Sequence, residues 1–333
     1  MKRVLLAGIG LAALASVAWF GWAMVTERAV TGWLDAREAE GWVVTRESVA
    51  VSGFPTAFVT EFTDLSLADP STGLVWSAPS FTLRQAAWDA SRIEATWPET
   101  HSLASPYERL TITAGDLASS LDLRLASNMA LEASETRMRD LSVDSTLGWR
   151  SHIAEGRFDM VLQQGEAASY AIHFEASDLT PPEELAALLD PAGVLPEAIP
   201  VVLSDAVVTF DRPWDLGALE EARPQPVRIA LTEARAEWGD LMLRLSGTLD
   251  MDDAGRPTGE VAIRAQNWAE MLDMVERAGL LGGIGRRSVD TALGFLAGMS
   301  GRREDLDVTL RFEDGFMYLG PLPIGEGPRL RLR

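Results

Sequence analysis

Three acidic residues and a glycine stand close together near position 250 and have the chemistry of a calcium loop. A calcium loop between two helices needs oxygen ligands at its first, third and fifth positions, glycine at the sixth and a bidentate glutamate at the twelfth. Asp250, Asp252 and Gly255 fit this spacing, but the fifth position is alanine and the twelfth is valine. Alternating apolar and polar residues flank the loop and are typical of strands. We therefore interpret residues 252–257 as a hairpin turn and predict no metal site.

The other residues capable of chemistry form no recognisable catalytic pattern. His101, His152 and His173 are far apart, and none has a second ligand type at metal-site spacing. The chain has no cysteine, which excludes a thiol nucleophile, thiolate metal ligands and disulfides. The glycines of residues 280–287 match neither the dinucleotide nor the nucleoside-triphosphate spacing, and we interpret them as a turn between helices. We predict a protein that is not an enzyme and has no cofactor, while acidic residues that converge only in the fold leave a hydrolase open as an alternative.

Composition and charge exclude nucleic acid as a partner. The chain has 333 residues, of which 47% are hydrophobic, enough for a substantial core. Its formal net charge of −20 would repel a phosphate backbone and weaken attraction to anionic lipid head groups.

The N-terminus, residues 1–25, has the pattern of a membrane anchor. Lys2 and Arg3 precede an uncharged run of 22 residues, Val4–Val25, which as a helix would span a hydrocarbon core of about 30 Å. A cleaved signal peptide is the alternative, because residues 13–15 and residues 16–18 each resemble a small-x-small cleavage site. The apolar run continues beyond both sites and carries two tryptophans, which favours an uncleaved anchor. With the basic residues held inside, we predict a single-pass inner-membrane protein whose bulk lies in the bacterial periplasm.

A second, amphipathic helical segment follows at residues 26–41. Ala29, Val30, Trp33 and Leu34 recur at helical spacing, and Gly41 is a suitable C-terminal stop. We expect this linker helix to hold the rest of the chain close to the bilayer.

From Trp42 onward the pattern changes to a period of two. Short alternating runs separated by Gly, Asp, Ser and Pro are typical of antiparallel strands with one apolar face. Gly239-Asp240 and Asp314-Gly315 are two-residue hairpin signals, and few long helical patterns occur. We therefore predict a mainly β fold with minor α, in which a transmembrane helix precedes a large curved antiparallel β-meander over residues 42–333. Its form would be a groove or an open sandwich.

Helical patterns interrupt the strands at three places. Residues 181–189 and 216–222 are short, and the clearest pattern is a helix pair at residues 268–298. Two apolar stripes on this pair could dock a protein partner. Their candidate docking residues are Trp268, Met271, Leu272 and Val275 after Asn267 in the first helix, and Leu293 and Leu296 in the second.

Several motifs in a fixed order resemble a bacterial family. They are Gly53-Phe54-Pro55, Trp76-Ser77-Ala78-Pro79, Trp97-Pro98, the run SGTLDMDDAGRPTGEVAI before Asn267-Trp268, and the closing run EDGFMYLGPLPIGEGP. Together they resemble the domain-of-unknown-function family 2125 over nearly the whole chain. An anchor, long antiparallel strands and a closing hairpin are more distantly similar to the AsmA-like envelope proteins. That similarity implies a lipid-lined groove or a role in outer-membrane assembly, and it supplies no catalytic residues.

Two functions remain open at this point. In the first, the sheet presents an apolar face to phospholipid or to an envelope protein, because a meander with few helices must cover that face with something. In the second, the chain is a scaffold that binds an envelope partner through the helix pair. The same apolar residues would also suit a closed sandwich core, since alternation shows that one face is buried and not what covers it.

Overall fold

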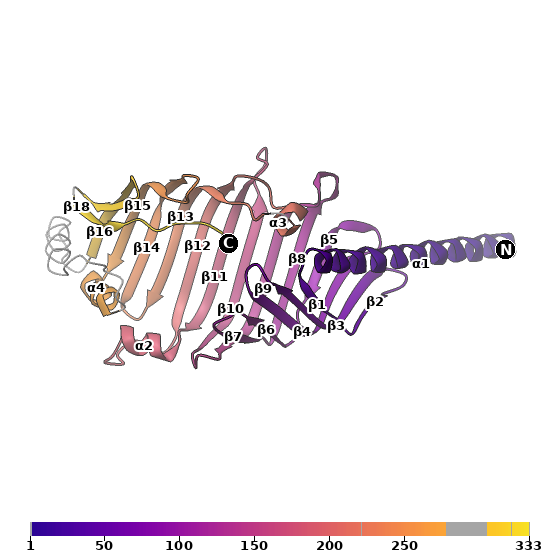
Figure 1. Ribbon diagram of the computed structural model, residues 1–333, viewed down its shortest axis with the longest axis horizontal. Helices are drawn as coiled ribbons and strands as arrows, with labels where there is room; N and C mark the ends of the chain where they lie inside the picture. Colours follow the sequence, from indigo (N-terminus) through magenta and orange to yellow (C-terminus); the bar gives the residue numbers. More distant parts are fainter. Residues whose placement is uncertain (1, 221, 278–304, 321, 333) are drawn as a thin grey trace. The chain divides into compact units, whose positions relative to one another are not determined.

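The computed structural model describes residues 2–220, 222–277, 305–320 and 322–332 (Figure 1). Strands hold 58% of the residues in a large antiparallel sheet, and helices are few, which confirms the prediction of a mainly β fold. The chain divides into two compact units. The first comprises residues 1–125 and 138–148, and the second comprises residues 126–137 and 149–333.

The first unit opens with one continuous helix, α1 (Lys2–Ala39), which joins the predicted anchor to the predicted linker helix. The Gly41 N–H donates to the Glu38 carbonyl at 3.0 Å, and the Trp42 N–H donates to the Arg37 carbonyl at 3.0 Å. This pairing closes the last turn and requires a left-handed residue, supplied by Gly41 at φ 99°. The prediction that Gly41 ends this helix is confirmed. Among the described residues, no helix combines the length and apolar character needed to span a bilayer.

From Trp19 onward, α1 packs on the sheet of its own unit. Trp19 and Ala23 are buried against Phe58, and Leu34 is buried with Phe62 further along the helix. The indole N–H of Trp19 donates to the carbonyl of Ala57 at 3.1 Å. Spacings of four and eleven residues place these side chains on one helical face. The amphipathic pattern therefore serves contact with the sheet.

The sheet of the first unit is built around a central antiparallel pair, β3 and β4. Its strands are β1 (Val43–Thr45), β2 (Ser48–Ser52), β3 (Ala57–Asp69), β4 (Leu74–Ala86), β5 (Asp89–Thr96), β6 (Thr100–Ala104), β7 (Arg109–Thr113), β8 (Asp116–Arg124) and the end of β9 (Ala130–Ser145). β1 and β2 both pair with β3, whereas β5 and β6 both pair with β4. β8 pairs with β5, β7 pairs with β6, and β9 pairs with β7. This unit departs from a simple meander, because short strands share an edge of a longer one.

An aspartate in left-handed conformation interrupts the long strand β3. Asp64 has φ 48°, and the pairing with β4 skips from Thr63–Ser80 to Leu65–Ala78, so Pro79 stands opposite the interruption. Aspartate tolerates this conformation better than most residues, and proline is accepted where a strand is irregular. The interruption shifts the alternation by one residue and keeps Leu65 buried on the same face as Phe62.

The second unit contains the predicted meander. Its strands are the start of β9, β10 (Arg150–Leu162), β11 (Ser169–Thr180), β12 (Ile199–Phe210), β13 (Pro226–Trp238), β14 (Leu241–Met251), β15 (Pro257–Gln266), β16 (Asp305–Glu313), β17 (Phe316–Leu319) and β18 (Leu322–Glu326). From β10 to β18 each strand pairs antiparallel with the next one in the chain. Both predicted two-residue hairpins are confirmed, because Trp238 pairs with Leu241 and Glu313 pairs with Phe316.

The helices that the structure describes in the second unit are short. They are α2 (Glu183–Leu189), α3 (Leu216–Glu220) and α4 (Trp268–Arg277), and the 3-10 turn Leu125–Ser127 precedes β9. All three helices fall within or beside the predicted helical segments. The second helix of the predicted pair, with Leu293 and Leu296, and the turn at residues 280–287 lie outside the described residues.

Candidate functional site

The candidate calcium residues are occupied by turn and strand contacts. Asp252 Oδ1 accepts hydrogen bonds from the backbone N–H groups of Ala254 and Arg256, each at 2.9 Å, and Asp252 Oδ2 accepts one from Arg256 Nε at 2.8 Å. The backbone N–H of Arg256 is the main cause that lowers the pKa of Asp252. Asp250 pairs with Arg228 at 2.8 Å. The interpretation of this stretch as a hairpin loop between β14 and β15 is confirmed.

The two faces of the second unit's sheet differ in chemistry. Strand pairing from β10 to β16 places one set of alternating residues on a common face that carries no charged side chain, which we call the apolar face. Its members are Phe158, Met160, Leu162, Tyr170, Ile172, Phe174, Ala176, Val202, Ser204, Ala206, Val208, Ile229, Leu231, Ala234, Ala236, Trp238, Leu241, Leu243, Leu245, Leu249, Val261, Ile263, Ala265, Leu306, Val308, Leu310 and Phe312.

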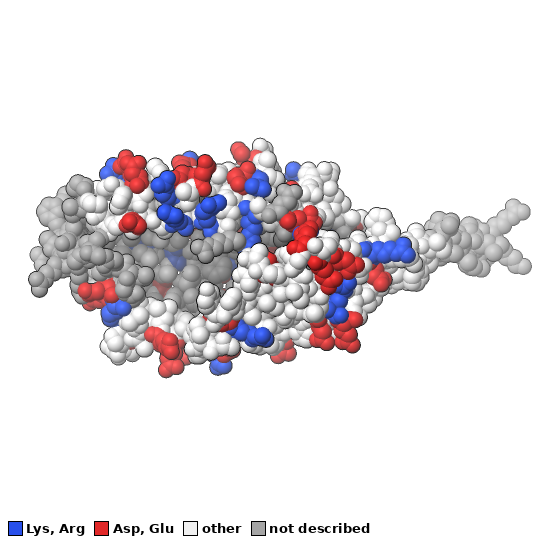
Figure 2. Space-filling view, in the orientation of Figure 1, with Lys and Arg blue, Asp and Glu red and all other residues white. Residues whose placement is uncertain are grey.

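The opposite face carries polar and charged side-chain pairs across neighbouring strands. His173 Nδ1 lies 2.7 Å from Asp205 Oδ1, and Arg264 Nε lies 3.1 Å from Asp307 Oδ2. His173 therefore lies on the polar face of the sheet. Figure 2 shows acidic and basic side chains gathered along the upper and lower margins of the region that Figure 1 assigns to β11–β16. Water can solvate these pairs, so this face needs no cover.

At one end of the apolar face, α4 forms a cover. Trp268 and Leu272 are 7% exposed and pack with Ala265, Leu306 and Val308 of the sheet. Two predicted docking residues are thus part of this unit's own core. Met271 is half-buried beside the same cluster, and Val275 lies in α4. The Asn267 side chain, placed before the helix by the sequence, donates to the carbonyl of Asp240 at 2.8 Å.

The helix α2 extends this cover, and a loop covers the other end of the apolar face. Trp238, Leu241 and Met274 form a cluster with Leu189 of α2, and the Arg277 guanidinium donates to the Leu189 carbonyl. At the far end, a separate cluster brings Trp214 and Leu131 onto Tyr170, Phe210 and Met160. The Tyr170 hydroxyl donates to the Leu131 carbonyl at 3.3 Å and accepts from the backbone N–H of Trp214 at 3.2 Å.

Between these two covered ends lies a central band of half-buried apolar side chains. The central band consists of Ile172, Phe174, Ala206, Leu231, Leu245 and Val261. Within the described part of the second unit, all strands belong to one sheet, so no described strand lies across the band. Because both edges of each strand are paired, the band offers side-chain carbon and few free polar groups. Such a surface suits an elongated apolar ligand.

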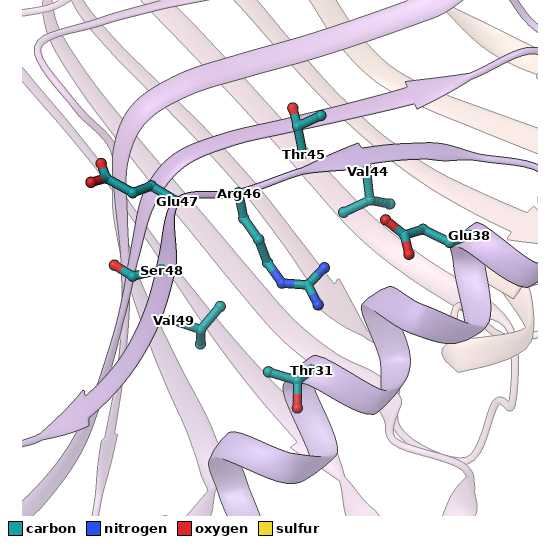
Figure 3. A pocket seen from close by; sticks show the side chains of 8 residues that line it. All are labelled: Thr31, Glu38, Val44, Thr45, Arg46, Glu47, Ser48 and Val49. Atoms are coloured by element: carbon teal, nitrogen blue, oxygen red, sulfur yellow. The ribbon is translucent and has the colours of Figure 1, made fainter.

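Recesses also occur in the first unit. A recess of about 530 Å³ lies between α1 and the corner that joins β1 to β2 (Figure 3). Arg46 points from this corner toward α1, and its Nη2 lies 2.7 Å from Asp35 Oδ1. Glu38 and Glu47 also line the recess, and the Glu47 side chain points away from Arg46 (Figure 3). The pair fastens the helix to the strands.

A second recess of about 390 Å³ in the same unit is lined by hydroxyl side chains and by His101. Ser66 Oγ and Ser77 Oγ lie 2.8 Å apart across β3 and β4. His101 is 6% exposed, its ring lies 5.6 Å from that of Trp97, and burial lowers its pKa. The second recess places serine hydroxyls near His101, but among the described residues no hydrogen bond joins the His101 ring to a hydroxyl, and its Nδ1 has no partner. The described residues also hold no cluster of metal-ligating side chains.

The buried His101 predicts a pH-dependent stability. Burial holds the pKa of His101 in the folded protein below its ordinary value of 6.5, which the unfolded chain retains. The unfolded chain therefore binds a proton at this side chain more readily than the folded protein does. The free energy of unfolding should therefore fall as the pH drops through about 6.5, by about 1.4 kcal/mol for each unit of pKa difference. Denaturant unfolding of the wild type and of His101→Phe, repeated between about pH 7.5 and 5.5, measures this slope. An identical slope in both proteins would contradict the assignment to His101.

Together, fold and surface define a class: a mainly β protein with a long N-terminal helix and a sheet that is uncharged on one face. A family model described as an uncharacterised protein conserved in bacteria, DUF2125, matches residues 19–328. The chain belongs to this family. No curated protein and no solved structure gave a significant match. The more distant resemblance to AsmA-like proteins therefore stays a prediction.

The individual residues of the apolar face were not identified from the sequence. The period of two indicated that such a face exists, but cross-strand neighbours depend on register. Sequence reasoning also missed the cluster in which Phe54 and Phe58, at the turn after β2, contact the rings of Trp19 and Phe20 in α1. Their signal was the uncharged stretch from Ser48 to Thr60, which lies between Glu47 and Glu61.

Proposed function

We propose that the chain is a non-catalytic cell-envelope protein that binds phospholipid acyl chains on the apolar face of its second unit. The observation that carries the proposal is the central band. Ala206, Leu231, Leu245 and Val261 lie on the four consecutive strands β12 to β15, are only half-buried, and have no charged neighbour on their face. An acyl chain matches such a band because it needs no hydrogen-bond partners and gains from removing apolar area from water.

We also propose that the chain resides in the inner membrane as a single-pass protein with its bulk in the periplasm. This rests on the sequence, in which Lys2 and Arg3 precede the uncharged run of residues 4–25. A reporter enzyme that works only outside the cytoplasm, fused after Arg333, should be active. Activity of a cytoplasm-only reporter at the same position would contradict this orientation.

Docking of an envelope protein through the helix pair is the alternative. Burial of Trp268 and Leu272 against the sheet argues against α4 as a free docking surface. The burial of these two side chains therefore favours the proposal that lipid binds on the central band over the alternative that a protein partner docks on α4.

The lipid proposal is tested by what remains bound to the full chain. We would purify the chain from membranes in mild detergent, exchange the detergent for an amphipathic polymer and examine the protein by native mass spectrometry. Phospholipid retained at a fixed number per chain through the purification and the exchange supports the proposal. A chain that loses all lipid and does not take it up again from added phospholipid would contradict it.

A further inference from the structure

One end of the first unit carries exposed aromatic side chains at the point where α1 extends beyond the sheet. Phe20 of α1 stacks on Phe54 of the β2–β3 turn, with ring centroids 5.6 Å apart and an interplanar angle of 13°. The two side chains remain 59% and 48% exposed. Both also contact Trp19, which is buried and stacked on Phe58. The exposed pair is therefore held rigidly by a buried pair.

A third exposed aromatic residue lies on the neighbouring turn at this same end of the sheet. The Ala87 N–H donates to the Thr56 carbonyl at 3.0 Å, which joins the β4–β5 turn to the β2–β3 turn. The next residue, Trp88, is 78% exposed. We call Phe20, Phe54 and Trp88 the aromatic tip.

Charge is absent from the segments that build the aromatic tip. Residues 16–26, 48–60 and 85–88 contain no Asp, Glu, Lys or Arg, although the whole chain carries a net charge of −20. The uncharged sequence of α1 from residue 4 onward leads directly into this tip. Aromatic side chains favour the level of the lipid head groups, where their rings contact acyl carbon and their edges contact water.

We propose that the aromatic tip inserts into the interfacial layer of a phospholipid bilayer, so that the sheet of the first unit contacts the membrane beside its helix. This rests on the proposed membrane location and is independent of lipid binding on the apolar face. Insertion of apolar rings, with no basic residue in these segments, should depend little on salt, unlike the binding of basic patches to anionic lipid. The Gly53 backbone fixes the turn, because at φ 98° a Cβ there would lie 2.8 Å from the Ala57 carbonyl oxygen.

The absence of native cysteine allows a direct test with the full chain. Phe54→Cys would carry a fluorescent label as the only thiol and would be reconstituted into phosphatidylcholine vesicles, with or without phospholipid bearing a nitroxide near the head group. We expect the nitroxide lipid to quench the label, and iodide in the water to quench it at least threefold less than in the matched control. The control is Tyr107→Cys, which is 88% exposed on the turn between β6 and β7 at the opposite end of the strands.

Three results would overturn the proposal. One is iodide quenching at Phe54→Cys equal to that at Tyr107→Cys. Another is protection from iodide without nitroxide quenching, which would mean that protein covers the tip. The third is loss of the lipid contact in about 1 M salt. Trp88→Cys repeats the measurement at an exposed site and decides the matter if Phe54→Cys does not fold.

Discussion

Leu245→Glu should reduce the phospholipid retained by the purified chain at least about tenfold. Leu245 lies in the middle of β14, between Ala234 and Ile263 on the apolar face. A carboxylate there would lose its hydration against an acyl chain, which costs more than the ~1.4 kcal/mol that corresponds to a tenfold loss of affinity. Phospholipid extracted from equal amounts of wild-type and variant protein, quantified by mass spectrometry, gives the ratio.

Ser246→Glu is the matched control for this prediction. Ser246 is the next residue of β14, lies on the opposite face and is exposed. The same charge placed there should leave lipid retention unchanged, because solvent can hydrate it. Because Leu245 is only half-buried, a thermal melt should show that Leu245→Glu still folds. Equal lipid retention by both variants would argue that the apolar face does not hold the lipid.

Trp268→Ala should destabilise the protein by about 3–5 kcal/mol, as expected for a large aromatic removed from a core. Trp268 is 7% exposed and packs on Ala265, Leu306 and Leu319 of the second unit's own sheet. The change leaves a cavity that neighbouring strands can close only in part. Denaturant unfolding followed by circular dichroism measures the loss.

The control for this change lies two residues further along α4. Glu270 is exposed in the first turn of the helix, so Glu270→Ala should change stability by no more than about 0.5 kcal/mol. If Trp268→Ala also had an effect that small, Trp268 would not hold the helix to the sheet. The docking hypothesis for this helix would then regain support.

The sequence predicted the elements of the second unit better than those of the first. Hairpin dipeptides such as Gly239-Asp240 act locally, and consecutive strands joined by short turns pair with each other by default. In the first unit, Asp64 and Pro79 interrupt long strands, and β5 and β6 share one edge of β4. Which short strand joins which edge depends on contacts between distant residues, and alternation alone does not encode them.

The roles of individual side chains were harder to predict than their environment. The apolar stripe of α4 was visible from its spacing, yet the same spacing serves a docking face or a core face. Only the register of β15 and β16 shows that Trp268 lies over their shared apolar face. Likewise, the stripe on α1 predicted an amphipathic helix, and the sheet beneath Leu34 supplied the partner.

The most direct test of the account is to locate the lipid on the chain. Full-length protein would be reconstituted with phospholipid that carries a photoreactive diazirine on its acyl chain, irradiated, digested and mapped by mass spectrometry. The account predicts adducts on the central band, at Leu231, Leu245 and Val261, in addition to adducts on the N-terminal helix. Adducts confined to α1 and the aromatic tip, with none on β11–β15, would contradict the claim that this sheet binds lipid.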